Sequence, residues 1–185
     1  MRCVKRWALM RNTEEENIQE HSHMVAVLAH ALGVIRRDIF HQPCDVNALA
    51  TAALYHDASE ILTGDLPTPI KYHNAEIMSA YHAVEDLAVQ KLLGMLPPEL
   101  RETYADVLAE DKDGDIYPLV KAADKLSAYI KCIEERKAGN NEFLSAEAQT
   151  RAALEASPLP EVQYFLEHFI PAFERDLDEL GAIGQ

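Results

Sequence analysis

Cysteine is scarce in this chain of 185 residues, and Cys3, Cys44 and Cys132 lie far apart without a CxxC pair. An odd number of scattered cysteines argues against a disulfide framework and against a thiolate zinc site. Free cysteines are typical of a reducing compartment, so we expect a cytoplasmic protein.

Long apolar runs are missing as well. No stretch approaches the roughly 20 apolar residues that a membrane span needs. The basic residues at the start (Arg2, Lys5 and Arg6) are not followed by a continuous apolar run. The sequence therefore predicts neither a membrane anchor nor a signal peptide.

Basic residues are also few, with 17 Lys and Arg against 31 Asp and Glu, which gives a formal charge of −14. Binding to a nucleic-acid polymer depends on clustered Lys and Arg that contact phosphates. The charge excludes that class of partner, and a phosphorylated small substrate would need a metal or a few local cations to offset the acidic field.

What the chain does have is a helical pattern over most of its length, with 48% hydrophobic residues. No strand pattern, internal repeat or low-complexity tract is visible. A chain of this length fits one domain with a substantial core. We therefore expect an all-α fold, with residues 1–185 forming a single domain.

The helices are predicted from apolar spacing and from caps. His21, Val25, Leu28, Leu32 and Ile35 form one stripe, with Asn12, Thr13 and Asn17 as candidate caps before it. A second helix begins at Asp45, with inward Val46, Leu49, Ala50, Ala53 and Leu54. The glycine and two prolines of 62–70 predict a loop without regular helix. Further helices are expected at 73–93 (inward Ile77, Tyr81, Val84, Ala88 and Leu92), 97–109, 117–137, 142–156 and after Pro160 (Val162, Phe165, Phe169 and Phe173), the last with a bend at Pro171.

Three of these helices carry polar residues that point into apolar surroundings. His21 lies on the first stripe, and His56 and Asp57 end the second helix. Asp124 is a single acidic residue among the inward residues of the helix predicted over 117–137. Buried polar groups are costly unless something satisfies them. Two imidazoles and two carboxylates are a mixed set that suits a divalent transition metal such as cobalt, manganese or iron. Neighbouring helix residues point about 100° apart, which fits an octahedral ion better than a tetrahedral one.

Simpler interpretations exist for each residue taken alone. His21 fits a hydrogen-bonded core histidine, Asp124 fits a buried salt bridge, and a His-Asp dipeptide occurs by chance in many chains. Trp7 fits an aromatic anchor for the chain start, or an indole that packs against a sugar or base beside a phosphate-binding Arg6. Only the combination on three helices makes a metal site the better hypothesis.

Glu60 follows His56 by four residues and Asp57 by three. If the helix continues that far, its carboxylate lies beside the metal-facing pair. A carboxylate in that place can take a proton from an attacking water or give one to a leaving alkoxide.

The H…HD…D pattern resembles the HD-domain metal-dependent phosphohydrolases. Longer stretches resemble the bacterial HD-domain 5′-deoxynucleotidases: RW with LMRN at 6–12, EHS at 20–22, YHDASEILTGDLPTP at 55–69, LVK with AD at 119–124 and GNNEF at 139–143. The resemblance covers nearly the whole chain. It implies a helical HD-domain bundle that hydrolyses deoxyribonucleoside 5′-monophosphates, discriminates against ribonucleotides, uses a divalent ion, commonly cobalt or manganese, and forms a homodimer.

The same resemblance implies roles for individual residues. His21, His56, Asp57 and Asp124 would bind the metal, and His21, Asp57 and Asp124 would thereby also contact the substrate. Arg6 would orient the phosphate, and Trp7 would crowd the 2′ position of the sugar. Glu60 would be the catalytic carboxylate with Asp65 as a partner in proton transfer. The nucleotide site would be lined by Asp65, Leu66, Pro67 and Thr68.

Two alternatives remain open. Another HD-type phosphohydrolase would act on a nucleoside triphosphate, a cyclic nucleotide or a pyrophosphorylated alarmone, although the HHExxDGxGYP signature of the cyclic-dinucleotide group is missing. A metal-stabilised binding or sensor protein would bind without turnover, and Glu60 and Asp65 next to the ligands argue against it.

Overall fold

The computed structural model describes residues 1–71, 73–109, 114–176 and 178–179. Within these ranges the chain is helical, and the only β-type pairing is an isolated antiparallel bridge between Lys5 and Asn17. The prediction of an all-α fold is therefore confirmed.

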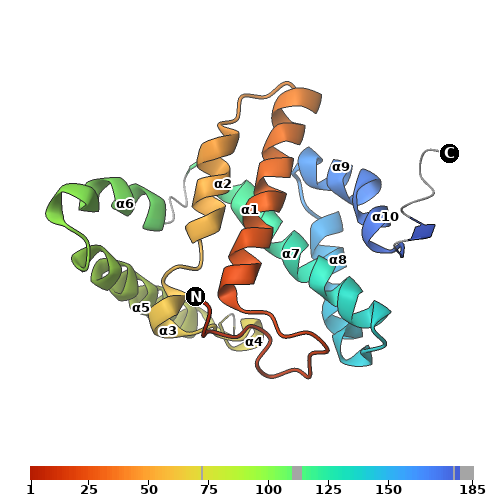
Figure 1. The fold of residues 1–185 in the computed structure, drawn as a ribbon, viewed down its shortest axis with the longest axis horizontal. Helices are drawn as coiled ribbons and strands as arrows, with labels where there is room; N and C mark the ends of the chain where they lie inside the picture. The colour runs from red at the N-terminus through yellow and green to blue at the C-terminus, as the bar shows by residue number, and fades with distance from the viewer. Residues whose placement is uncertain (72, 110–113, 177, 180–185) are drawn as a thin grey trace.

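Three helices form the centre of the molecule. Helix α1 (Ile18–Val34) packs against both α2 (Val46–Tyr55) and α7 (Tyr117–Lys137), as Figure 1 shows. Their facing side chains are fully or almost fully buried and build the core, for example Val25, Leu49 and Leu126. Burying a side chain of this size is worth about 1.5–3 kcal/mol, so this contact fixes how the polar residues on the three helices lie relative to one another.

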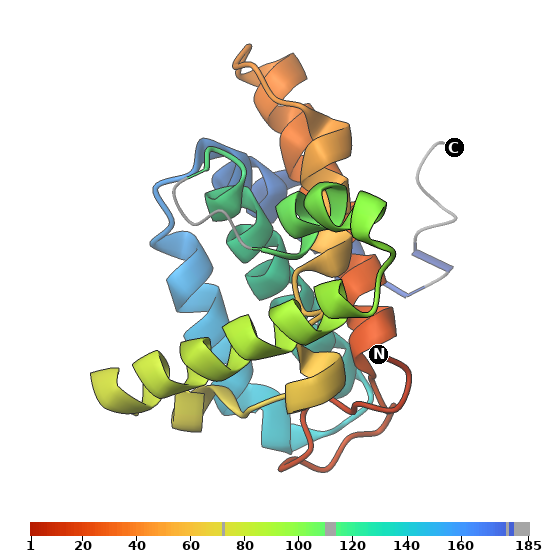
Figure 2. The same ribbon diagram turned by 90° about the vertical axis from the view of Figure 1, so that its left-hand side faces the viewer.

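The other helices surround this centre. A π-helical turn η1 (Ile35–Ile39) follows α1 directly. On one side of α7 lie α5 (Ala75–Gly94) and α6 (Arg101–Leu108), and on the other side lie α8 (Leu144–Glu155), α9 (Pro160–His168) and α10 (Ile170–Phe173) (Figures 1 and 2). The remaining short elements are α3 (Glu60–Thr63), α4 (Thr68–Lys71), η2 (Pro98–Leu100) and η3 (Asn141–Phe143).

Side-chain caps start the helices that carry the polar residues. The Asn17 carboxamide accepts hydrogen bonds from the amides of Gln19 and Glu20, and Glu20 reaches back to the amide of Asn17. This capping box satisfies amides that a helix start otherwise leaves unpaired. Asp45 caps α2 more simply, because its carboxylate accepts hydrogen bonds from the amides of Asn47 and Ala48. Of the candidate caps before α1, Asn17 is the one used, and the start predicted at Asp45 is confirmed.

The segment 62–70 departs from the prediction. Leu62 and Thr63 belong to α3, which ends at Gly64 with a φ of 75°, and α4 starts at Thr68. Pro69 therefore lies in the first turn of a helix, where its missing N–H costs nothing. The prediction of a loop without helix was wrong. Proline breaks a helix in its interior, but it is well tolerated in the first turn, so its presence does not exclude a helix that starts there.

Three predicted inward residues are exposed: Leu54 by 41%, Val84 by 48% and Phe169 by 42%. Phe169 lies at the break between α9 and α10, where the chain turns two residues before Pro171. Leu54 and Val84 are not completely covered by any helix of the described chain. In the described residues no helix is long and apolar enough to cross a membrane.

Candidate active site

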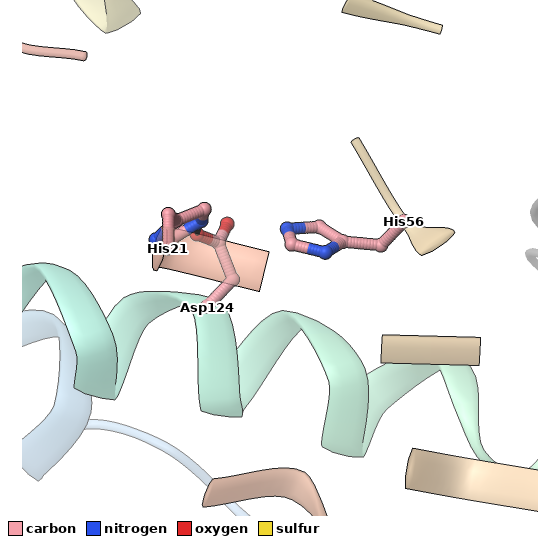
Figure 3. A group of neighbouring side chains, drawn as sticks. All are labelled: His21, His56 and Asp124. Carbon is pink, nitrogen blue, oxygen red and sulfur yellow. Dashed lines mark ion pairs between the residues drawn. The ribbon is translucent and has the colours of Figure 1, made fainter. Parts of the chain in front are cut away.

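The four polar residues singled out from the sequence lie together. His21 is in the first turns of α1, His56 caps the C-terminal end of α2 with Asp57 next to it, and Asp124 is in the middle of α7. One ligand atom each of His21, His56 and Asp124 lies within 4.8 Å of the other two. Figure 3 shows the His56 ring directed at Asp124 and His21, which meet above α7.

The short distances all involve the Nε2 atoms of the two rings. His21 Nε2 lies 3.1 Å from Asp124 Oδ1 and 3.5 Å from Asp57 Oδ2. His56 Nε2 lies 3.2 Å from the same Asp57 oxygen. Asp57 therefore bridges the two rings, while the group whose ligand atoms all lie within 4.8 Å of one another consists of His21, His56 and Asp124.

The Nδ1 atoms of the rings face away from this point. His56 Nδ1 lies 2.7 Å from the carbonyl oxygen of Ala53, which accepts hydrogen bonds only. The hydrogen of a neutral His56 is therefore on Nδ1, and the Nε2 lone pair faces the carboxylates. His21 Nδ1 contacts the Ser127 hydroxyl at 3.2 Å.

Both Nε2 atoms are buried, and neither has a hydrogen-bond partner of good geometry among the described residues. Unpaired buried nitrogen atoms are costly, and a cation between them and the carboxylates satisfies all four groups at once. The residues therefore fit a divalent metal ion, on the grounds of both donor chemistry and unpaired atoms.

Opposite charges control the ionisation of these groups. Burial works to raise the pKa of Asp57 and Asp124, but the adjacent imidazoles hold the pKa of each carboxyl below its usual range. Burial works to lower the pKa of His56, and the Asp57 carboxylate more than reverses this. The point where the four side chains meet thus favours positive charge, whether from a proton or from a cation.

Arg6 brings a permanent cation to the edge of the cluster. Its Nη1 lies 3.6 Å from Asp57 Oδ2, and its side chain is 13% exposed. Burial works against its charge, but the carboxylates of Asp124, Glu16 and Asp57 raise its pKa, so the guanidinium stays charged. Trp7 packs against Phe143 with ring centroids 5.2 Å apart.

Glu60 is the first residue of α3, and its amide donates to the Asp57 carbonyl at 3.1 Å. Helix α2 ends at Tyr55, so Glu60 comes near the pair through a turn and a new helix, not by the continuous helix considered from the sequence. Its side chain is buried, and its Oε2 is unpaired. Burial, and then the charges of Asp57 and Asp65, raise the pKa of Glu60 to about 9.

The other predicted site residues lie in the segment between α3 and α4. Asp65 is partly buried, and burial is the main reason why its pKa is raised. Leu66 and Pro67 are partly buried in the same segment. The side chain of Thr68 lies outside the described part of the structure. The roles of these four residues in lining a nucleotide site remain predictions.

A cavity of about 390 Å³ opens beside the cluster, and His56 and Asp57 are among its lining residues. Lys71, His82, Tyr117 and Lys121 line it too, and none of them was assigned a role from the sequence. The usable signal was the position of Lys121, one helical turn before Asp124 and so on the same face of α7. Glu16 and Ser127, which contact the cluster residues, were missed as well.

Helices that converge on a His/His-Asp/Asp cluster beside a cavity define an HD-type phosphohydrolase. The HD-domain phosphohydrolase from Listeria innocua superposes with a TM-score of 0.82 at 26% identity, covering 92% of this chain and 83% of that one. The cyanophage S-2L HD phosphohydrolase DatZ, bound to dA and one catalytic Zn²⁺, superposes with a TM-score of 0.58 at 25% identity, covering 96% and 92%.

The comparison of sequences is more specific. The model of the 5′-deoxynucleotidase YfbR-like family matches residues 1–173, and the chain belongs to this family. The 5′-deoxynucleotidase YfbR of Shigella flexneri serotype 5b is 49% identical over 182 residues, which cover 98% of this chain and 92% of the relative. The chain is therefore an enzyme of the phosphoric monoester hydrolase class, as the resemblance implied.

Proposed function

We propose that this chain removes phosphate from deoxyribonucleoside 5′-monophosphates at the cluster of His21, His56, Asp57 and Asp124. The observation that carries the proposal is the convergence of His21, His56 and Asp124 within 4.8 Å, with Asp57 against both rings. The family of the chain and the dA bound to DatZ support a deoxynucleotide substrate.

His21, His56, Asp57 and Asp124 would hold a divalent cation, with cobalt, manganese or another transition metal suited to the mixed nitrogen and oxygen donors. When bound, such a cation polarises a phosphoryl oxygen and lowers the pKa of a water molecule towards neutral pH. The zinc ion of DatZ supports a transition metal in this fold without deciding which ion this chain uses.

Arg6 would bind the phosphate. Its guanidinium lies beside Asp57, is largely buried and stays charged. Paired N–H donors in a fixed plane match two phosphate oxygens, and they stabilise the charge that grows on these oxygens during in-line attack. Asp57 holds this guanidinium on the side of the cluster where the phosphate arrives.

Glu60 and Asp65 would move the protons. The oxygen of water forms a bond to phosphorus as the bond from phosphorus to the sugar O5′ breaks. One carboxylate takes the proton of the attacking water, and the leaving oxygen takes up a proton from a carboxyl group. Glu60 is suited to such a role because its buried Oε2 has no other partner in the described part of the chain.

Trp7 would contact the sugar, because it follows Arg6 directly in the chain. An indole packed against the 2′ carbon leaves no room for a ribose hydroxyl, and rejection of an added group on steric grounds accounts for a preference for deoxynucleotides. Asp65, Leu66, Pro67 and Thr68 would line the nucleotide site on the side of α3 and α4.

The test is a phosphate-release assay on a panel of nucleotides, with metal-stripped and metal-reloaded protein. We expect release from deoxyribonucleoside 5′-monophosphates by the reloaded protein only, and a loss of about 10²–10⁴-fold for Glu60→Gln. Glu76→Gln, on the exposed start of α5, is the matched control and keeps wild-type activity.

The same panel separates the alternatives. Faster turnover of a nucleoside triphosphate, a cyclic nucleotide or an alarmone assigns the chain to another HD-type substrate. Metal binding without turnover of any compound indicates a scaffold that binds and does not catalyse.

A homodimer in the cytoplasm, without nucleic-acid or membrane partners, completes the proposal. Exposed apolar side chains support self-association, because Leu54, Ile61 and Leu87 are 41%, 42% and 63% exposed. Light scattering on a size-exclusion column measures the mass. A dimer that Leu87→Glu converts to a monomer is expected, and a monomeric wild type contradicts this part.

A further inference from the structure

One carboxylate contacts three residues of the site at once. Glu16 Oε2 accepts a hydrogen bond from the Trp7 indole N–H at 2.9 Å and one from Arg6 Nε–H at 3.3 Å. Its other oxygen, Oε1, lies 3.8 Å from His21 Nδ1. The Glu16 side chain is 15% exposed, so these contacts are largely shielded from water.

The backbone around Glu16 also ties Arg6 to this place. The Arg6 amide donates to the Glu16 carbonyl at 2.9 Å, and the Ile18 amide donates to the Val4 carbonyl at 3.0 Å. Residues 4–6 and 16–18 thus run side by side at the start of α1. Glu16 is joined to Arg6 by both main chain and side chain.

Trp7 needs such restraint because its backbone is in an unfavourable conformation. Its φ is 56°, in the left-handed region that bulky residues rarely adopt. A residue of this kind costs about 1–3 kcal/mol and persists only where the surroundings hold it. The described contacts that hold the indole are the hydrogen bond to Glu16 and the packing against Phe143.

We infer that Glu16 is a positioning residue that fixes the phosphate-binding guanidinium and the sugar-facing indole relative to each other. Through Arg6 it sets the affinity for the phosphate, and through Trp7 it sets the preference for a deoxyribose. The inference rests on the proposed function for what Arg6 and Trp7 contact, and on the geometry alone for the placement of Trp7.

The two effects depend on different properties of the side chain. The neutral indole N–H needs only an oxygen acceptor, which a glutamine amide also offers. The guanidinium gains from the negative charge, because hydrogen bonds between charged groups are about twice as strong as neutral ones. Glu16→Gln therefore separates the two effects, whereas Glu16→Ala removes both.

The first measurement does not depend on activity. Trp7 is the only tryptophan of the chain, so the protein fluorescence reports on this residue alone. In Glu16→Ala we expect a red-shifted emission and stronger quenching by acrylamide, with Glu16→Gln close to wild type. Glu15→Ala is the matched control, since Glu15 is 72% exposed and pairs with the exposed Lys5. It is expected to behave as wild type.

The second measurement uses kcat and KM for a deoxy and a ribo 5′-monophosphate. Glu16→Ala is expected to raise KM and to lower the ratio of deoxy to ribo kcat/KM, each by roughly 5- to 10-fold, the effect of one hydrogen bond. Glu16→Gln is expected to raise KM and to keep the ratio. A Glu16→Gln protein that loses the ratio but keeps the wild-type KM overturns the inference.

Folding and function are controlled separately. Far-UV circular dichroism shows whether Glu16→Ala is folded, and if it is not, the kinetic measurement on Glu16→Gln carries the test. If the wild type hydrolyses no nucleotide, the proposed function fails, and the fluorescence still decides whether Glu16 positions Trp7. Quenching in Glu16→Ala equal to that in Glu15→Ala overturns the inference in either case.

Discussion

The Glu135 carboxylate accepts hydrogen bonds from both the backbone amide and the hydroxyl of Thr13, at 2.9 and 2.6 Å. It also accepts a hydrogen bond from Asn140 Nδ2 at 2.8 Å and pairs with Lys131, whose Nζ reaches the carbonyl of Glu14 at 2.6 Å. Glu135 in α7 thus holds the segment that leads from Arg6 to α1.

Replacement of Glu135 tests how much this attachment contributes. Glu135 is 1% and Lys131 is 8% exposed, so Glu135→Ala leaves a buried ammonium without its carboxylate. We expect the free energy of unfolding to fall by about 3 kcal/mol, as measured by urea denaturation. Glu134→Ala, the exposed neighbour, is the control and should lie within about 0.5 kcal/mol of wild type. An equal fall in the free energy of unfolding in both variants would show that the contacts of Glu135 do not hold this segment.

The same carboxylate predicts a pH dependence. Burial works to raise the pKa of Glu135, but the hydrogen bonds from Lys131, Thr13 and Asn140 lower it from 4.5 to about 2. A carboxyl whose pKa is lowered by folding stabilises the folded state at pH values above its pKa in the unfolded chain. This contribution is lost as the pH falls from about 4.5 towards 2. We expect the difference in stability between wild type and Glu135→Gln to be largest at pH 6 and to shrink by roughly 2 kcal/mol by pH 2.5. A difference that does not change with pH contradicts the assignment.

Metal removal is expected to destabilise the fold, because it leaves the buried Nε2 atoms of His21 and His56 unpaired. Addition of a divalent transition metal at 100 times its Kd stabilises the folded state by about 2.7 kcal/mol, which corresponds to roughly 5–10 °C in Tm. Differential scanning calorimetry measures this shift. We expect it to disappear in His21→Asn and to remain in His23→Asn, the exposed histidine two residues further along α1. A shift of equal size in both variants places the metal elsewhere.

A close approach of α1 and α2 gives a test of the packing that brings His21 and His56 together. A Cβ added at Gly33 would lie 2.9 Å from Leu49 and 3.0 Å from Val46. Gly33→Ala is therefore expected to cost about 1–3 kcal/mol by overpacking. Gly94→Ala, at the end of α5 with nothing within 4 Å of the added Cβ, is the control and should be neutral or slightly stabilising. If Gly33→Ala is as stable as Gly94→Ala, the two helices have room to separate.

The sequence was enough to predict the main helices and the cluster. The spacing of His21 and the apolar residues after it located α1, and Asp45 located the start of α2. The convergence of His21, His56 and Asp124 followed from polar residues in apolar helices, because each needs a partner that only tertiary structure provides.

Other features depend on tertiary contacts that leave no local pattern. Glu16 lies in a run of three glutamates, and nothing in that run distinguishes the residue that receives the Trp7 indole from its exposed neighbour Glu15. Glu60 was expected on a continuous helix, whereas the chain turns at 56–59 before α3. The exposure of Leu54 and Val84 could not be predicted either, since an apolar stripe does not tell how much of it neighbouring helices cover.

The central claim is that His21, His56, Asp57 and Asp124 hold one cation beside the cavity. Anomalous diffraction from crystals grown with manganese or cobalt tests it most directly. The account predicts one strong anomalous peak per chain, within coordination distance of both Nε2 atoms and of a carboxylate oxygen from each aspartate. The absence of such a peak at full metal loading, or a peak from which Asp124 or His21 is turned away, would contradict it.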